Sequence, residues 1–417
     1  MKKAISDQKH NTDFHYDIVI AGGGLAGLSM VNALSCLSKK SHGRPLSVAV
    51  IEPNGHNHQQ DHADDPRQIA LTYGSKLIYE SLGLWDALSD RCTPMKTIHV
   101  SERGGPGSAR LFAEDYQVPA LGYVVAAQHL LEALENRLTT LADITLLHQA
   151  TVKAVDMSAG KKQLTITQQD KVFSLQTDLV IVAEGGRSSV MGQMGFHADE
   201  KDYGHTAILT IVGHSKLHNN VAYERFTDEG SVAMLPLSDN NGCKSALVWT
   251  MPSRLAAERL QLTDADFMKT LQSLFGDHCG SFYMVGKRSS FPLKLKIAAE
   301  PAQHGAVLLG NSAHSLHPIA GQGYNLTLRD VMMLASLLTT ANTQSLGDLS
   351  LLQRYLSQQK QDQFDTIFFS DYLIKVFTST NPLTRFARKA GLIFFDKAPF
   401  IKRWFGYRAM GMGGYGQ

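Results

Sequence analysis

The stretch YDIVIAGGGLAG, residues 16–27, decides the fold of this 417-residue chain. A short β-branched and apolar run ends there in three consecutive glycines, and Leu25–Leu37 then has the small and apolar residues of a helix. The next strand is expected over Leu46–Ile51, and it ends in Glu52. This order of strand, glycine turn, helix, strand and acid predicts a dinucleotide-binding unit.

Each glycine of the turn has a physical role in such a unit. Gly22 makes the tight turn, Gly24 lets the backbone approach a pyrophosphate, and Gly27 lets the helix pack on the sheet. The first N–H groups of the helix then face the phosphates. Glu52 stands where an acid that binds a ribose hydroxyl belongs, and it would repel a 2′-phosphate.

A second match to the same spacing, at Gly411–Gly416, has neither a strand before it nor a helix after it. We interpret it as a flexible tail without a ligand. The contrast shows that the glycine spacing predicts a nucleotide site only in its full context.

The composition excludes several classes of protein. The chain is 43% hydrophobic and 19% charged, so disorder is excluded, and 40 basic against 38 acidic residues argue against a nucleic-acid partner. Its 4 cysteines form no CxxC pair, which fits a reducing compartment. The N-terminal charges and apolar residues are not ordered as in a secretory signal, and no transmembrane helix is predicted. We therefore expect a cytoplasmic protein.

A polar segment follows the second predicted strand. Residues 54–64 are rich in His and Asp, but we interpret His56, His58 and His62 as solvated loop residues rather than metal ligands. Arg67 stands just before an expected apolar helix, and it is placed to reach the pyrophosphate or the ring of a cofactor. A surface ion pair is the alternative for this arginine.

Two further segments have the character of the central sheet. A strand over Thr177–Ala183 leads into Glu184, and another begins at Gly305 and reaches Asn311. The second is followed by a loop rich in Pro and Gly and then by a helix, so several backbone N–H groups meet at one place. That arrangement suits an electron-rich group. His314 and His317 in the loop lack a third ligand nearby, which argues against a metal site.

Three segments carry a resemblance to a known family. The glycine turn, AEG at 183–185 and GNSAHSLHPIAGQGYN at 310–325 look like the three fingerprints of single-component FAD-dependent aromatic hydroxylases. The segments AYERFT (222–227), AMLPLS (233–238) and NLTLRDVM (325–332) resemble, within that group, the hydroxylases of ubiquinone biosynthesis. The similarity runs from about residue 16 to past residue 352.

The resemblance implies an FAD site. The expected contacts are Gly22, Gly24, Gly27, Glu52, Arg67, Gln128, Glu184 and Asn311, with the flavin ring beside Pro318, Gly321, Gly323 and Asn325. The wider family usually has Asp where this chain has Glu184 and Asn311. Because Asn keeps a hydrogen bond but loses a charge, weaker or differently tuned FAD binding is expected.

The resemblance also implies a fold and its division. We expect an α/β protein with a Rossmann-like FAD-binding domain, an antiparallel β-sheet substrate domain and C-terminal helices. The FAD domain would comprise 14–92, 124–190 and 286–350, and the substrate domain 93–123 and 191–285. Residues 351–417 would form a C-terminal helical region and the flexible tail.

The implied chemistry is hydride transfer from NAD(P)H to FAD, reaction with O₂ to a flavin hydroperoxide, and hydroxylation of a polyprenylated methoxyphenol. NAD(P)H would bind transiently, since no second nucleotide fold is present. Tyr223, Arg225 and Met234 are substrate-pocket candidates, although sheet packing explains them equally well, and no catalytic base can be chosen among them. No metal is implied.

Alternatives remain open at this point. A flavin-dependent halogenase lacks support because Trp85, Trp249 and Trp404 stand alone, and a simple dehydrogenase would have no use for the third block. Two alternative functions remain. One is a flavin-binding assembly subunit without turnover, and the other is a hydroxylase that acts on another ring position or on another phenol.

The segment 385–410 interleaves basic and aromatic residues. It is suited to a membrane surface or a lipid-loaded partner, so peripheral association with the inner membrane or with a ubiquinone-biosynthesis complex is one expectation. A packed C-terminal helix with snorkelling cations is the other.

Overall fold

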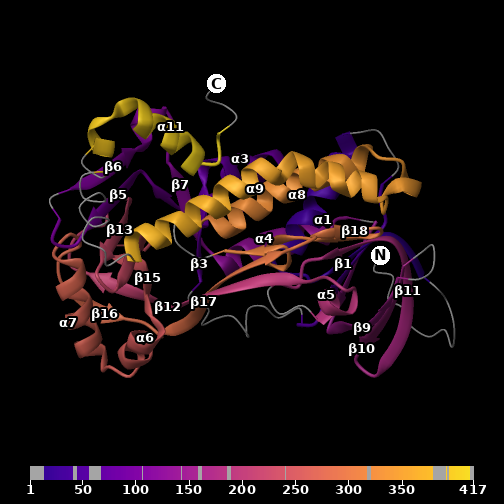
Figure 1. The fold of residues 1–417 in the computed structure, drawn as a ribbon, viewed down its shortest axis with the longest axis horizontal. Coiled ribbons are helices and arrows are strands. Elements are labelled where there is room, and N and C mark those ends of the chain that lie inside the picture. The colour runs from indigo at the N-terminus through magenta and orange to yellow at the C-terminus, as the bar shows by residue number, and fades with distance from the viewer. Residues whose placement is uncertain are drawn as a thin grey trace.

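The computed structural model describes residues 14–40, 45–55, 67–105, 107–141, 143–157, 162–185, 189–239, 241–316, 321–378, 391 and 394–413. Two large sheets lie side by side along the longest axis of the molecule, and helices cover them (Figure 1). The mixed α/β architecture confirms the predicted fold class.

The first sheet is parallel at its centre. β1 (Phe14–Ala21) pairs with β2 (Val48–Glu52) on one side and with β11 (Lys171–Val182) on the other. β8 (Ile144–His148) and β19 (Ala306–Leu308) extend the parallel part outward. Because both faces of this sheet are covered, the buried parts of β1 and β2, residues 18–21 and 48–51, are apolar on both faces.

The two faces of this sheet have different covers. On one face, Ile18 and Ile20 pack against a helical layer that forms one core with them. That layer consists of α1 (Leu25–Lys40), α3 (Tyr73–Ser81), α4 (Ala127–Leu138) and α8 (Gln322–Thr340). On the other face, Val19 and Ile51 pack against β9 (Ala150–Asp156), β10 (Lys162–Gln168) and α5 (Ser189–Gln193).

The second sheet has 9 strands and contains one parallel pair, β13–β5. Its strands in order are β20 (His314–Ser315), β17 (Ser289–Ala298), β12 (Ala198–His214), β15 (Lys244–Pro252), β14 (Gly230–Pro236), β13 (Val221–Thr227), β5 (Thr97–Glu102) and β6 (Ser108–Phe112), with β16 (Phe282–Val285) on β12. The helices α6 (Ser253–Leu260) and α7 (Asp264–Phe275) cover one face around the buried Trp249. The predicted antiparallel character of this region is confirmed.

Two further parts connect the sheets. A small sheet of β3 (Gln68–Thr72), β7 (Gly122–Ala126) and β4 (Thr93–Met95) lies between them, and β18 (Ala302–Gln303) pairs with β19. The long helix α9 (Leu349–Thr378) begins in the core of the first sheet and reaches the second, where Asp371 accepts from Tyr203 of β12 (Figure 1). β17 and β20, which lie within the predicted FAD segment 286–350, pair into the second sheet, and the predicted domain boundaries stay a prediction. The segment directly after Arg67, expected to be a helix, forms β3 instead.

The last described helix, α11 (Pro399–Ala409), lies over β6 and β7 (Figure 1). Met410 is 2% exposed, and its carbonyl accepts from the N–H of Gly74 at 2.8 Å. The segment after α11 was expected to be a flexible tail, but its described part packs on α3. Among the described residues, none of the helices combines the length and apolar character needed to cross a bilayer.

Candidate active site

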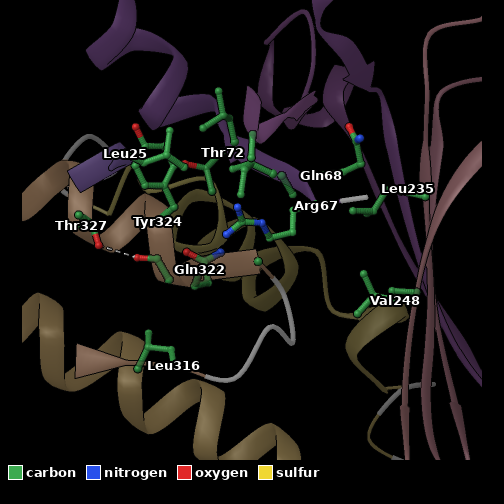
Figure 2. A pocket seen from close by; sticks show the side chains of 18 of the residues that line it. Leu25, Arg67, Gln68, Thr72, Leu235, Val248, Leu316, Gln322, Tyr324 and Thr327 are labelled. Atoms are coloured by element: carbon green, nitrogen blue, oxygen red, sulfur yellow. Dashed lines mark hydrogen bonds between the residues drawn. The ribbon is translucent and has the colours of Figure 1, made fainter. Parts of the chain in front are cut away.

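A cavity of about 1320 Å³ lies between the two sheets. Sites for one small ligand commonly measure about 300–1,000 Å³, so this space can hold a cofactor together with a second molecule. It has three walls: the glycine turn and loops at the carboxyl ends of the first sheet, one face of the second sheet, and residues of α9 and α11. In Figure 2, Leu235 and Val248 project from the second sheet into the space that also holds Arg67.

The glycine turn forms the floor of the cofactor half. The first bond within α1 is from the N–H of Leu28 to the carbonyl of Gly24 at 2.9 Å, so earlier N–H groups have no acceptor within the helix. A Cβ on Gly27 would lie 1.9 Å from the carbonyl oxygen of Gly22, whereas a Cβ on Gly24 would meet nothing within 4 Å. Gly27 thus permits helix–strand packing, and Gly24 leaves open space where a pyrophosphate would lie.

Glu52 lies at the end of β2, beside the turn, and is 7% exposed. Its Oε2 accepts from the N–H of Gly23 at 2.7 Å, and its Oε1 accepts from the N–H and side-chain amide of Asn54. These bonds fix the carboxylate at the cavity wall, and Oε2 has a lone pair left for a ribose hydroxyl. The residues present therefore fit the adenosine half of FAD.

The remaining predicted cofactor contacts separate into two groups. Arg67 lines the cavity and is exposed, and Glu184 and Asn311 line it as well. Asn311 lies in a 3-10 turn, Gly310–Ser312, directly after β19. Gln128 is not among the lining residues, and its amide donates to Glu132 at 3.1 Å within α4.

The predicted flavin loop is described from Gly321 onward, whereas Pro318 and His317 lie outside the described residues. Gly321 and Gly323 line the cavity. Gly321 has φ 59°, in the left-handed region, which any residue other than glycine would occupy at a cost. This conformation starts α8 at the cavity and directs its first N–H groups there.

Asn325 was expected beside the flavin, but it is 0% exposed and absent from the cavity lining. Its Oδ1 accepts from the N–H of Thr72 at 2.8 Å and from Ser75 at 2.7 Å. Its Nδ2 donates to the carbonyls of Ala70 at 2.8 Å and Gly321 at 2.7 Å. The amide is therefore used in full to hold the flavin loop against β3 and α3.

A chain of hydroxyl groups lies behind the same loop. Tyr324 lines the cavity, and its hydroxyl is 2.6 Å from that of Tyr79 and 2.9 Å from that of Ser29. Burial raises the pKa of Tyr324 to about 12, so this group stays a neutral hydrogen-bonding residue at physiological pH. The chain connects the loop to α1 and α3.

The second sheet contributes an almost wholly apolar face. Strand pairing aligns one row of cavity-lining residues across six strands. The row consists of Ala109, Val100, Glu224, Ala233, Val248 and Leu209. Glu224 is the single carboxyl in this row, and sequence reasoning did not select it.

The three substrate-pocket candidates lie mainly on the opposite face of that sheet. Met234 is 0% exposed in the core beneath α6 and α7, and Arg225 donates to the carbonyl of Leu274 at 3.0 Å. Neither lines the cavity. Tyr223 belongs to the lining, but its ring packs edge-on against Phe275 of α7, with the centroids 5.6 Å apart. Side chains alternate along a strand, so Glu224 between Tyr223 and Arg225 faces the cavity instead.

The C-terminal wall is aromatic. Phe369 and Tyr372 of α9 and Phe395 and Phe405 from the α11 region line the cavity, and the rings of Phe369 and Phe405 lie 5.4 Å apart. Tyr372 is also 55% exposed, so this wall reaches the molecular surface.

The histidines considered as metal ligands do not form a metal site in the described part of the chain. His314 is buried, and its Nε2 lies 2.6 Å from Oδ2 of Asp330. His56, His58 and His62 lie outside the described residues. No group of three or more His, Cys, Asp or Glu in the described ranges is arranged to hold a metal ion.

Comparisons with known proteins agree with this geometry. A family described as "FAD binding domain" matches residues 15–363. The ubiquinone hydroxylase UbiL of Rhodospirillum rubrum is 32% identical, over 95% of this chain and 89% of its own. The 3-demethoxyubiquinol 3-hydroxylase of Escherichia coli is 28% identical, over 93% and 96%. The structure of p-nitrophenol 4-monooxygenase PnpA from Pseudomonas putida has the same fold, with a TM-score of 0.75 at 16% identity, over 96% of this chain and 99% of that one.

The chain therefore belongs to the FAD-dependent monooxygenases, which use NAD(P)H as reductant. Within them it is a flavoprotein hydroxylase of the ubiquinone-biosynthesis group. The predicted enzyme class and cofactor are confirmed. The individual cofactor contacts stay predictions that the geometry supports.

Proposed function

We propose that the protein hydroxylates a polyprenylated methoxyphenol in ubiquinone biosynthesis, of the type 2-octaprenyl-6-methoxyphenol. This proposal depends on one observation: the glycine turn and an apolar face of the second sheet line the same cavity of about 1320 Å³. A substituted phenol would lie on the row of β-strand residues that faces the flavin loop. The names of the relatives support the pathway, while the methoxyphenol substrate is part of the proposal.

The division of labour between cofactor and protein follows from the site. When bound, FAD takes a hydride from NAD(P)H and activates O₂, which supplies the oxygen atom. The chain holds the cofactor at Gly24, Glu52 and the loop at Gly321. The apolar wall around Val248 and Leu235 excludes water from the reacting ring, which protects an oxygen-transfer step from wasteful side reactions.

The aromatic C-terminal wall supports a route for the polyprenyl tail. Three rings of α9, those of Phe364, Phe368 and Tyr372, stack in succession at 5.8 and 5.9 Å and are each more than half exposed. Tyr372 also lines the cavity. We propose that the tail leaves the cavity between α9 and α11 and that this edge rests on a lipid surface, to which Phe400 and Trp404 of α11 also contribute.

The first experiment is a visible absorption spectrum of the purified protein with FAD, followed by NAD(P)H and a short-chain 2-alkyl-6-methoxyphenol in air. We expect bound oxidised flavin, phenol-stimulated O₂ consumption and a hydroxylated product identified by mass spectrometry. Flavin uptake with negligible NAD(P)H oxidation for every phenol tried would favour a flavin-binding assembly subunit instead. Product analysis by NMR then identifies the ring position.

The lipid contact is tested separately by co-sedimentation with vesicles of phosphatidylethanolamine and phosphatidylglycerol. Phe368→Ser and Trp404→Ser together should reduce the bound fraction several-fold, because each removes an exposed aromatic ring from the proposed edge. Leu217→Ser, which changes a residue 60% exposed in the connection between β12 and β13, is the matched control. Equal binding of the control and the double variant would remove the membrane part of the proposal.

A further inference from the structure

Glu224 occupies an unusual position in the cavity. It lies in β13, and its register partners are Val100 on β5 and Ala233 on β14, both apolar and both lining the cavity. A carboxyl in such a row loses hydration without gaining sheet packing. Packing of the sheet therefore does not explain why a carboxyl occupies this position.

The carboxyl is also incompletely paired. Ser231 of β14 provides a hydrogen bond to it, whereas Oε1 is buried and accepts no hydrogen bond from any described residue. A buried acceptor without a donor is rare, and it lowers the stability of the fold. An acceptor that faces a ligand cavity can recover this energy from a ligand that brings an O–H donor.

Burial raises the pKa of Glu224 from 4.5 to about 7, and the hydrogen bond from Ser231 opposes this only in part. The nearest ionisable group on the same sheet face is Glu102 of β5, which pairs with Phe226 one row further along. Across the cavity the charged groups are Arg67, Glu52 and Glu184, and the C-terminal wall adds the phenol of Tyr372. The groups on the far face of β13 are Tyr223 and Arg225.

We propose that Glu224 is a catalytic residue that accepts the proton of the substrate's phenolic hydroxyl. This inference rests on the proposed function, since it needs a phenol in the cavity. The orientation follows from the row itself: a methoxyphenol placed on an apolar face with one acceptor turns its hydroxyl toward that acceptor. Sequence reasoning could not choose a base, and the structure supplies a candidate.

The step is a proton transfer and is balanced without a further reactant. The O–H bond of the phenol breaks, its electron pair stays on oxygen and spreads into the ring, and the proton binds to the Glu224 carboxylate. The ring becomes more electron-rich and so reacts better with the activated oxygen. Phenols have a pKa near 10, so a carboxylate with a pKa near 7 is a much better acceptor than an ordinary one.

The test compares the wild-type enzyme with Glu224→Gln, loaded with FAD and supplied with NAD(P)H and 2-alkyl-6-methoxyphenols. Gln keeps the size of the side chain but cannot take a proton. We expect the turnover of the variant to fall about 10²–10⁴-fold, the usual contribution of a general base. The wild-type rate should rise with pH through about 7, because the acceptor must be ionised, and the variant should lose this rise.

A second readout does not depend on turnover. The ultraviolet difference spectrum of a bound phenol whose own pKa an electron-withdrawing group lowers to about 7, taken without NAD(P)H, should show more phenolate near pH 7 in the wild type than in Glu224→Gln, because only the wild type has an acceptor of matching pKa. A phenol made more acidic by an electron-withdrawing group should recover most of the lost rate in the variant. Glu224→Asp, which restores a carboxyl, should recover part of it, and this variant replaces Glu224→Gln if the latter does not fold.

Glu102→Gln is the matched control, because it makes the same change at a buried carboxyl of the adjoining strand that does not line the cavity. Its pH profile should equal that of the wild type. A Glu224→Gln enzyme with an unchanged pH profile and unchanged spectra would overturn the inference and leave the proposed function intact. A wild-type enzyme that neither binds nor hydroxylates any phenol would overturn the proposed function itself.

Discussion

At the scale of single residues, Gly24 and Gly27 of the turn are expected to be required for different reasons, the first for cofactor binding and the second for stability. A Cβ on Gly27 would lie 1.9 Å from the backbone oxygen of Gly22, which cannot move without moving β1. We expect Gly27→Ala to lower the free energy of unfolding of the apoprotein by about 1–3 kcal/mol, as overpacking does. Gly24→Ala should leave that free energy nearly unchanged and instead weaken FAD binding about tenfold or more, because its Cβ enters the cofactor space.

Urea unfolding of both apoproteins and fluorescence titration with FAD measure the two quantities. Equal stability of the Gly27→Ala and wild-type apoproteins would show that the close contact is not a constraint. Unchanged FAD affinity in Gly24→Ala would show that the pyrophosphate lies elsewhere.

Asn325 provides the second prediction at this scale. Its side chain bonds four groups on three segments, so Asn325→Ala leaves several buried donors and acceptors unpaired. We expect a loss of about 2–4 kcal/mol in the free energy of unfolding, at about 1–3 kcal/mol for each unsatisfied group with some relaxation. Asn136→Ala, on the exposed side of α4, should cost less than about 0.5 kcal/mol. Thermal unfolding compares them, and similar losses would contradict the role of Asn325.

At the scale of elements, the contact between β20, α8 and α9 depends on one carboxylate. Asp330 of α8 meets His314 at 2.6 Å through Oδ2 and accepts from Gln363 of α9 at 2.9 Å through Oδ1. Asp330→Ala should destabilise the protein by about 3 kcal/mol or more, because the buried His314 and the half-buried Gln363 both lose their partner. Asp362→Ala breaks the partly exposed pair with Arg329 on the same two helices and should cost at most about 1 kcal/mol. Denaturant unfolding of both variants tests the difference, and equal midpoints would refute it.

The elements also show how far sequence reasoning reaches. The strand, turn and helix at residues 16–37 were predictable because local spacing alone determines them, and β1 and α1 have nearly the expected bounds. The face of β13 was not predictable. Tyr223 and Glu224 are neighbours, and the period of two fits either phase until the partner strands and the helices above them are known. Sequence reasoning selected Tyr223, Arg225 and Met234, and of these only Tyr223 lines the cavity.

Asn325 illustrates a second limit. Its place in the motif GQGYN predicted a loop beside the cofactor space, and Gly321 and Gly323 of that loop line the cavity. The role of its side chain depends on Thr72 and Ala70, which lie about 250 residues earlier in the chain. Pairing across such a distance follows from the tertiary fold and is not encoded in local spacing.

At the scale of the whole molecule, buried histidines link stability to pH. Burial is the main cause that lowers the pKa of His99 to about 4, and it also lowers the pKa values of His129, His214 and His278. The unfolded chain therefore binds more protons than the folded one below the ordinary histidine pKa of 6.5. The free energy of unfolding should decrease as the pH falls from about 6.5 toward about 4.

Glu224 acts in the opposite direction, because its raised pKa stabilises the folded state at low pH and this contribution is lost as the pH rises from 4.5 through about 7. Urea unfolding at a series of pH values measures the sum of these effects. His99→Gln should flatten the acid side of the curve, and an unchanged slope would show that His99 does not contribute.

The three walls of the cavity come from different parts of the chain, and the match to the FAD-binding family ends at residue 363. The aromatic wall of Phe369, Tyr372, Phe395 and Phe405 lies beyond that limit. The glycine turn and this wall are therefore separate stretches of the chain. On the tail route proposed above, substitutions in the aromatic wall are expected to change the preferred length of the substrate while leaving the glycine turn and Glu52 in place, which makes the wall a starting point for enzyme engineering.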